Sequence, residues 1–270
     1  MTDNSPIGVF DSGIGGLTVI KELTWLMPQE HYIYFGDTAR APYGSRPPAQ
    51  ILDFMHQILR FFAANKVKMA VFACNTMTAL GLEGARRQYP FPLVGMNTGA
   101  RVALKTTRNK HVGIIATQAT VASGKHGKAL KVIDPNVIVY PQACPKFVPF
   151  VERGELDGER LEAAANEYLA PLREAEVDTL ILGCTHYPFI SPLIRRVIGQ
   201  GVELVDPACE TALDARHCLT KHGCQAGPGR GTVRLCFSGG LDCAERLADS
   251  VIGDRLPEFE QVDLQDYVLS

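Results

Sequence analysis

The sequence lacks Cys-x-x-Cys pairs and long apolar runs, and its formal net charge is only −2 over 270 residues. Eight cysteines without framework spacing, behind a polar N-terminus that has no signal-peptide pattern, predict free thiols in place of disulfides. The balanced charge gives no general attraction to nucleic acid. No apolar run is long enough to span a bilayer. We therefore expect a cytoplasmic protein that binds neither nucleic acid nor membrane.

Signals of metal and phosphate binding are missing as well. The densest group of possible metal ligands lies between Cys209 and Cys224, and because its spacing matches no zinc-site pattern, scattered cysteines are the simpler interpretation. The glycine turn Asp11–Gly16 reads Gly-x-Gly-Gly where a dinucleotide loop reads Gly-x-Gly-x-x-Gly, and its aspartate would repel a phosphate. We predict neither a metal site nor a dinucleotide site.

Two short stretches that resemble each other are the main positive signal. Cys74-Asn75-Thr76 follows an apolar run that begins at Val67, and Cys184-Thr185-His186 follows one that begins at Thr179. Each predicts a buried strand that ends at a thiol and is followed by small polar residues. A single buried cysteine is usually a small apolar filler. Two thiols in matching motifs favour a functional site instead.

The order of the expected elements predicts an α/β protein with an internal duplication. Nearly the same number of residues separates Gly8 from Cys74 as separates Gly113 from Cys184. We therefore predict two pseudo-symmetric α/β domains, each with a central mainly parallel sheet, and an active site in the cleft between them at the strand C-termini. The predicted domains are residues 1–97 with 207–270, and residues 98–206. The expected strands span residues 7–10, 31–36, 67–74, 92–96, 111–117, 137–140, 178–183 and 232–237, and the expected helices span 17–23, 49–66, 77–88, 159–176, 211–222 and 241–252, with a further helix that ends near 130.

Paired thiols suit one type of reaction better than others. A cysteine nucleophile needs one thiol with a nearby histidine. Two equivalent thiols instead suit a reaction in which a proton leaves one face of a carbon and another arrives at the opposite face, which is racemisation or epimerisation. Asp11 and His186 are the expected acid/base partners, one for each thiol.

The remaining polar residues of the motifs provide donors for a substrate carboxylate. They are Ser12, Asn75, Thr76, Thr117 and Thr185. Asp11 and Ser12 also suit helix N-caps, and His186 alone could be a core histidine. Neither cysteine motif contains a lysine that could form a Schiff base, so the chemistry is expected to need no cofactor.

Several motifs together resemble the glutamate racemases of the cofactor-independent aspartate/glutamate racemase superfamily. The motifs run in the family's order from residue 7 to about residue 206. They are Gly8–Val19, Phe35–Gly44, Ala73–Thr76, Ala143–Pro145, Phe147–Gly154 and Leu182–Pro188. The combination is specific, whereas the glycine turn alone would not be.

The resemblance implies a homodimer that converts L-glutamate to D-glutamate for peptidoglycan. It implies Cys74 and Cys184 as the two bases and Asp11, Glu152 and His186 as supporting groups. Glu152 lies in an exposed-looking charged run, for which a solvated surface is the alternative interpretation. The resemblance marks these substrate-binding positions: Asp11, Ser12, Tyr43, Gly44, Asn75, Thr76, Thr185 and His186. Thr117 and Thr120, which the internal repeat places opposite Ser12 and near Thr18, complete the predicted set.

Two other functions compete with this interpretation. The same machinery could act on another acid, such as aspartate or a substituted malonate. Decarboxylating relatives of the fold need only one thiol, so two thiols favour racemisation. The second competitor is a binding protein that inhibits DNA gyrase, and the net charge gives no support for direct DNA binding.

Overall fold

The protein is represented by a computed structural model that describes residues 2–252 and 257–267. The side chains of residues 242, 243, 249–251 and 266 lie outside this description. The chain divides into two compact units, Met1–Met96 with Ala208–Ser270, and Asn97–Pro207. Each unit is an α/β structure with a parallel sheet, which confirms the predicted fold class.

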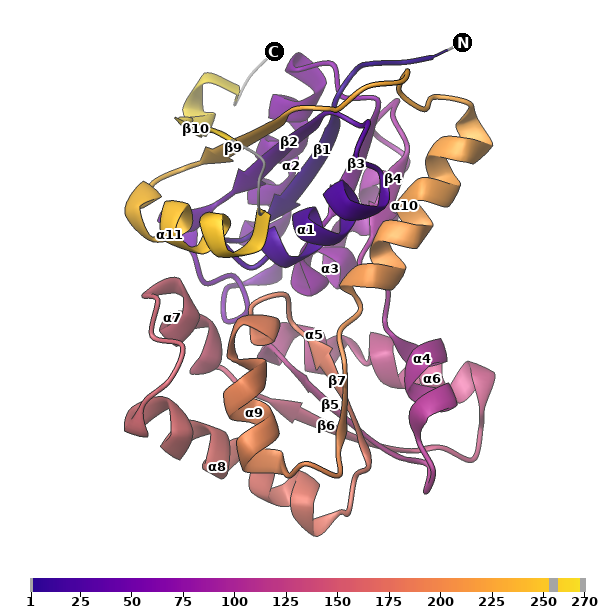
Figure 1. Cartoon of the computed structure of the whole chain (residues 1–270), viewed down its shortest axis with the longest axis vertical. Helices are drawn as coiled ribbons and strands as arrows, with labels where there is room; N and C mark the ends of the chain where they lie inside the picture. The colour runs from indigo at the N-terminus through magenta and orange to yellow at the C-terminus, as the bar shows by residue number, and fades with distance from the viewer. Residues whose placement is uncertain (1, 253–256, 268–270) are drawn as a thin grey trace. The chain divides into compact units, whose positions relative to one another are not determined.

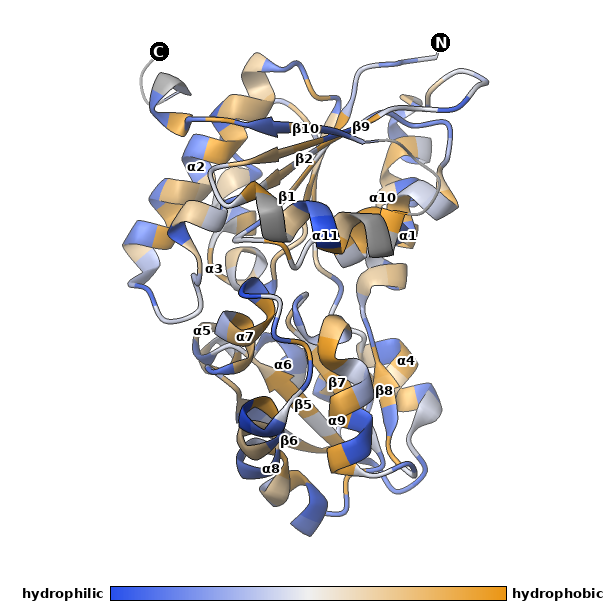
Figure 2. Ribbon diagram, turned by 60° about the vertical axis from the view of Figure 1, so that its left-hand side comes forward, coloured by the Kyte–Doolittle hydropathy of each residue, from blue (hydrophilic) through white to orange (hydrophobic). Residues whose placement is uncertain are grey.

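A parallel sheet forms the centre of the first unit. Among the described residues it contains six strands in the order β10-β9-β2-β1-β3-β4. The strands are β1 (Ile7–Asp11), β2 (Tyr32–Gly36), β3 (Met69–Phe72), β4 (Leu93–Gly95), β9 (Val233–Phe237) and β10 (Glu258–Gln261). Every residue of β1, β2 and β3 is buried, as expected for a parallel sheet that helices cover on both faces. The edge strand β10 is polar and mostly exposed (Figure 2), which discourages pairing with other chains.

Helices cover both faces of this sheet. Figures 1 and 2 show α1, α10 and α11 on one face and α2 and α3 on the other. The helices are α1 (Leu17–Leu26), α2 (Pro48–Ala64), α3 (Asn75–Ala85), α10 (Ala208–His222) and α11 (Leu241–Ile252), with 3₁₀ turns at Thr38–Arg40 and Leu264–Tyr267. Phe10 of β1 packs against Phe62 and Phe72, with ring centroids 5.7 and 4.6 Å away. This aromatic cluster holds α2 against the sheet.

The second unit repeats the plan on a smaller scale. Its sheet is parallel, with the order β6-β5-β7-β8. The strands are β5 (His111–Ala116), β6 (Ile138–Ala143), β7 (Thr179–Gly183) and β8 (Glu203–Val205). The helices are α4 (Ala100–Thr106), α5 (Gln118–Ser123), α6 (Lys125–Ile133), α7 (Phe147–Glu152), α8 (Glu159–Glu174) and α9 (Ser191–Ile198), with a 3₁₀ turn at Tyr187–Ile190. Helices α8 and α9 lie on one face of the sheet, and α4 and α6 lie on the other (Figure 1).

The two sheets share a strand order that explains the duplicated motifs. The order β2-β1-β3-β4 in the first unit corresponds to β6-β5-β7-β8 in the second. In each unit the first strand is paired with the strand that leads to the cysteine. Phe10 lies opposite Phe72, and Ala116 lies opposite Gly183. The residues that follow these strands therefore meet at the carboxyl edge of each sheet.

Several local features differ from the sequence predictions. The helix expected to end near residue 130 is split into α5 and α6 at Gly124, whose φ of 64° is left-handed and suits glycine. Helices α4, α7 and α9 and strands β8 and β10 were not predicted, because each of them is short. No helix in the described part of the chain combines the length and the apolar composition needed to cross a membrane.

Candidate active site

The first cluster of predicted site residues, called here the Cys74 group, consists of Asp11, Ser12, Cys74, Asn75 and Thr76. The parallel pairing of β1 with β3 brings all five to one edge of the sheet. Asp11 is completely buried and Cys74 is 5% exposed, so the group is shielded from bulk water. Low exposure strengthens the electrostatic interactions among these groups.

A chain of polar contacts joins the thiol of this group to a carboxylate. The Cys74 Sγ lies 4.0 Å from the Ser12 Oγ, and the Ser12 Oγ lies 3.4 Å from the Asp11 Oδ1. The same Asp11 oxygen accepts a hydrogen bond from the Gly13 N–H at 2.9 Å. Asp11 was predicted as the partner of Cys74, and the structure places the Ser12 hydroxyl between them.

The position of Cys74 at a helix start gives this group its donors. Cys74 is the N-cap residue of α3 and has an extended backbone, with Asn75 as the first helical residue. The positive end of the helix dipole therefore lies beside the sulfur and favours negative charge there. The Asn75 Nδ2 is buried and has no hydrogen-bond partner among the described residues. An amide in that state is a ready donor for a substrate carboxylate.

Tyr43 is held by a buried carboxylate that the sequence reasoning did not single out. Its hydroxyl donates to Asp37, whose other contacts are Arg40 Nε at 2.7 Å and Ser238 Oγ at 2.8 Å. Both Tyr43 and Asp37 are buried. Burial, and then the neighbouring Asp37 charge, raise the pKa of Tyr43 well above its usual value, so its hydroxyl stays protonated. Gly44 is half-buried in the turn that follows.

The second cluster, called here the Cys184 group, consists of Glu152, Cys184, Thr185 and His186. Cys184 follows β7 directly and is 6% exposed. Its Sγ lies 3.8 Å from the His186 Nδ1, and the His186 Nε2 lies 2.5 Å from the Glu152 Oε1. Glu152 ends α7, and its side chain is 16% exposed. The solvated-surface alternative for Glu152 is therefore wrong, because its carboxylate holds the histidine.

The charge state of His186 follows from these contacts. Complete burial would by itself lower the pKa of His186, but the hydrogen bonds to Cys184 and Glu152, together with their charges, raise this pKa well above its usual value. The imidazole is therefore protonated at neutral pH. Its positive charge lies beside the Cys184 sulfur, because the His186 Nδ1 is 3.8 Å from the Sγ.

The predicted threonines of the second unit form a local cap. Thr117 is the N-cap of α5, and its Oγ1 accepts a hydrogen bond from the Thr120 N–H at 3.3 Å. The two hydroxyls lie 3.0 Å apart, and both residues are buried. Thr117 follows Ala116 of β5, which is paired with β7, so the cap lies on the same sheet edge as Cys184.

Three residues near the Cys184 group were not assigned a role from the sequence. The Tyr187 hydroxyl donates to the Cys144 carbonyl at 3.1 Å, which ties the start of α7 to the turn that carries Cys184. Burial raises the pKa of the Cys144 thiol, which therefore stays neutral. His126 is 4% exposed, and burial lowers its pKa to about 4. No sequence pattern pointed to these contacts, because they join segments that are distant along the chain.

Five further cysteines with described side chains lie outside the two groups. Cys74, Cys144, Cys184, Cys209, Cys218, Cys224 and Cys236 form no disulfide within the described part of the chain. Within the described residues no group of three or more histidine, cysteine or acidic side chains is arranged to hold a metal ion. The side chain of Cys243 lies outside the described part of the chain.

Comparison with known proteins shows that this chain is similar to a family of racemases. The profile of the Asp/Glu/hydantoin racemase family matches residues 18–214. A glutamate racemase from Thermoanaerobacter pseudethanolicus is 41% identical over 265 residues, which is 98% of this chain and 100% of that protein.

Two solved structures are similar over nearly the whole chain. A glutamate racemase isoform from Bacillus anthracis has a TM-score of 0.89 at 34% identity and covers 97% of this chain and 98% of its own. A glutamate racemase from Francisella tularensis, solved in complex with D-glutamate, has a TM-score of 0.87 at 34% identity and covers 98% of this chain and 100% of its own.

Proposed function

The chain belongs to the Asp/Glu/hydantoin racemase family, and we propose that it interconverts L- and D-glutamate without a cofactor. Full-length similarity to glutamate racemases, one of them solved with D-glutamate, supports this substrate. The chain is an amino-acid racemase, and glutamate is the acid that its relatives are named for. The D-glutamate formed would supply peptidoglycan synthesis.

The proposed mechanism rests on one observation. Each unit contains a buried thiol that is linked to a carboxylate through one polar group. The links are Cys74–Ser12–Asp11 in the first unit and Cys184–His186–Glu152 in the second. Both thiols follow topologically equivalent strands. A thiol on each face of the α-carbon is what a two-base proton exchange requires.

The proton transfers balance between the two groups. In one direction the Cys184 thiolate removes the α-proton, and the carbanion that forms takes a proton from the Cys74 thiol on its opposite face. The product is the other enantiomer, with Cys74 left as a thiolate. The link through Ser12 to Asp11 and the link through His186 to Glu152 then offer routes by which the starting protonation states return.

Binding of the substrate uses the small polar residues of both groups. The unpaired Asn75 Nδ2 and the N-terminal amides of α3 suit a carboxylate near Cys74. We propose that the hydroxyl groups of four further positions donate hydrogen bonds to the substrate: Ser12, Thr76, Thr185 and the Thr117–Thr120 cap. Tyr43 and Gly44 are proposed to complete the substrate contacts.

Incubation with L-glutamate in deuterated water, with no added cofactor, tests the proposal. We expect loss of optical rotation together with deuterium at the α-carbon. Cys74→Ala and Cys184→Ala should each lower kcat by at least about 10³-fold, because a missing base removes the proton transfer on one face. Cys209→Ala, which removes an exposed thiol, is the matched control and should retain activity.

Two results would refute this function. The two-base mechanism would be excluded if Cys74→Ala or Cys184→Ala still racemised glutamate as the wild type does. Racemisation of aspartate with a higher kcat/KM than glutamate would assign the same machinery to the competing substrate. No observation on this chain favours a gyrase-binding role.

We further propose that the protein is a cytoplasmic homodimer, as the family resemblance implies. Sedimentation velocity of the purified chain should give twice the mass of one chain. A single-chain mass across the micromolar range would refute the dimer.

A further inference from the structure

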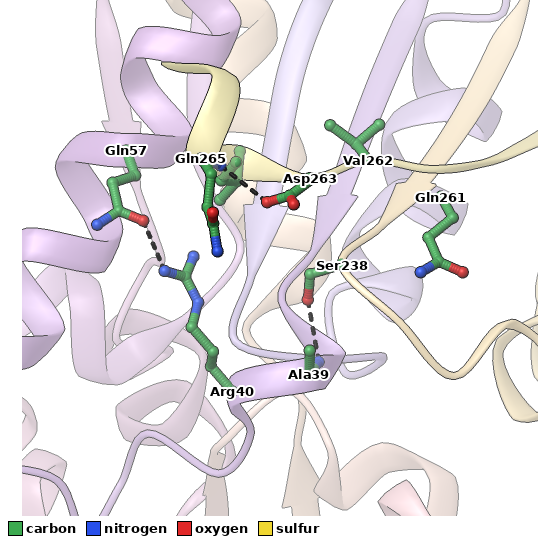
Figure 3. Close-up of a pocket in the computed structure, with 9 residues that line it drawn as sticks. Ala39, Arg40, Gln57, Ser238, Gln261, Val262, Asp263 and Gln265 are labelled. Atoms are coloured by element: carbon green, nitrogen blue, oxygen red, sulfur yellow. Dashed lines mark hydrogen bonds between the residues drawn. The ribbon is translucent and has the colours of Figure 1, made fainter. Parts of the chain in front are cut away.

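A cavity of about 280 Å³ lies within the first unit, among side chains that neither catalytic group uses. Its walls come from the turn Ala39–Arg40, from Gln57 of α2, from Ser238 after β9 and from the segment Gln261–Gln265 (Figure 3). The volume is close to the lower end of ligand pockets and suits a molecule the size of an amino acid. All of the walls belong to one compact unit.

Arg40 is held in the wall of the cavity by two of its guanidinium nitrogens, and the third nitrogen makes no hydrogen bond to the described residues. Its Nε bonds to Asp37 at 2.7 Å and its Nη1 to the Gln57 Oε1 at 2.6 Å, and the Phe54 ring lies 4.0 Å from its Cζ. Its Nη2 is shielded from water and has no hydrogen-bond partner among the described residues. Figure 3 shows this nitrogen pointing away from Gln57 and toward Gln265.

An unpaired guanidinium nitrogen removed from water is costly, and this cost calls for an explanation. A carboxylate is the group that matches a guanidinium best. The side chain of Gln265 is exposed and would have to move aside for a carboxylate to reach Nη2. The cavity can therefore bind an anionic group at the Arg40 Nη2.

The other walls of the cavity carry one negative charge and several neutral carboxamides. Asp263 contributes an exposed carboxylate, and Gln57, Gln261 and Gln265 contribute carboxamides. A simple anion would be repelled by Asp263, whereas a ligand that carries an ammonium group as well would be attracted to it. Amino acids carry a carboxylate and an ammonium group, and α-amino acids are the smallest molecules of this class.

We propose that this cavity is an effector site for a free α-amino acid, separate from the substrate groups. The carboxylate of the ligand binds Arg40, and its ammonium group binds Asp263. Only the kinetic consequence of binding rests on the proposed racemase function.

The cavity is connected by hydrogen bonds to Tyr43, one of the proposed substrate contacts. Arg40 and the Tyr43 hydroxyl share one oxygen of Asp37, and Ser238, which also lines the cavity, donates to the other. A ligand carboxylate at the Arg40 Nη2 competes with Asp37, which binds the Nε of the same guanidinium, for its positive charge. This competition loosens the contact that holds Tyr43, so an occupied cavity should weaken glutamate binding.

Calorimetric titration with glycine tests the site. Glycine is the smallest amino-acid zwitterion and has no stereocentre, so turnover does not contribute to the heat. We expect saturable binding to the wild-type protein, and at least a tenfold weaker Kd in Asp263→Asn. Asn75→Ala, which changes the proposed substrate site and not the cavity, is the matched control and should bind glycine as the wild type does.

Three further measurements complete the test. Acetate and ethylammonium, which each carry one half of the zwitterion, should bind more weakly than glycine. Glycine should raise the KM for L-glutamate by about fivefold or more in the wild type, within the usual range of coupling between sites, and should not do so in Asp263→Asn. Because Asp263 is exposed and outside the catalytic groups, this variant should keep its basal activity.

Several results would overturn the proposal. Absence of heat with glycine, unchanged affinity in Asp263→Asn, or loss of binding in Asn75→Ala would each remove the site. Acetate that binds as tightly as glycine would exclude the zwitterion, and an unchanged KM in the presence of bound glycine would exclude the coupling. If glutamate is not racemised at all, the calorimetric result still decides whether the cavity binds an amino acid.

Discussion

At the scale of single residues, the two thiols have different intermediaries. Ser12 joins Cys74 to Asp11, whereas His186 joins Cys184 to Glu152. A hydroxyl only passes a proton along, but an imidazole can also hold a charge next to the thiol. The raised pKa of His186 depends in part on Glu152, so this carboxylate controls the charge beside Cys184.

Glu152→Gln should lower kcat/KM by about 10²-fold, which is at the low end of acid/base contributions. The amide removes the charge that raises the His186 pKa, while burial, which lowers it, remains. The imidazole then loses its proton at a lower pH, so the alkaline limb of the kcat/KM profile should move to lower pH. The profile is measured by circular dichroism of glutamate at varied pH.

A matched control separates this effect from a general disturbance of α7. Glu155 is three residues away and pairs with Arg153 on the surface, so Glu155→Gln should leave the pH profile in place. The primary isotope effect adds a second readout. It should increase in Glu152→Gln only for the α-deuterated enantiomer that Cys184 deprotonates, and an equal increase for both enantiomers would contradict the assignment.

At the scale of elements, α3 positions the thiol because it packs tightly against α2. A Cβ added at Gly81 would lie 2.3 Å from the Met55 Sδ and 3.0 Å from the Leu52 Cδ2, whereas a Cβ at Gly84 would meet nothing within 4 Å. Close packing on one side of the helix and open space on the other allow a paired test within one element.

Gly81→Ala should lower the free energy of unfolding by about 1–3 kcal/mol, since the added methyl forces α2 and α3 apart. Gly84→Ala should raise it by about 0.5–1 kcal/mol, because alanine favours the helical backbone more than glycine does. Urea titration followed by circular dichroism measures both. Equal effects of the two substitutions would show that contact with Met55 does not constrain α3.

At the scale of the whole molecule, the two units carry unlike groups beside their thiols, whereas the proposed reaction is symmetric. The enantiomers of glutamate have the same free energy, so the equilibrium constant is unity and kcat/KM must be equal in the two directions. The individual constants are free to differ, because the thiolate and thiol forms of the two sites are stabilised by different neighbours.

We therefore expect kcat from L-glutamate to differ from kcat from D-glutamate, and the ratio to change with pH as His186 titrates. KM should change in parallel, so that the ratio of kcat/KM stays at unity. Initial rates from each pure enantiomer across pH measure both quantities. A kcat ratio that stays constant with pH would show that His186 does not set the difference between the directions.

The sequence by itself was enough for the fold class and for the residues that end the strands. Apolar runs that stop at Asp11, Cys74 and Cys184 predict buried parallel strands, and side chains that follow such strands gather at one sheet edge. Duplicated spacing predicted that the two halves share a plan, and the common strand order in both sheets agrees with it. Local patterns are sufficient for these features because strand burial and turn chemistry depend on nearby residues.

Only the tertiary structure decided which groups touch. Ser238 meets Asp37, and Glu152 meets His186, across separations that leave no periodic signal in the sequence. The protonation of His186 also depends on burial and on two neighbours from different elements. Hydrogen-bond partners and charge states arise from packing between distant segments, whereas strands and motifs arise from residues close together in the chain.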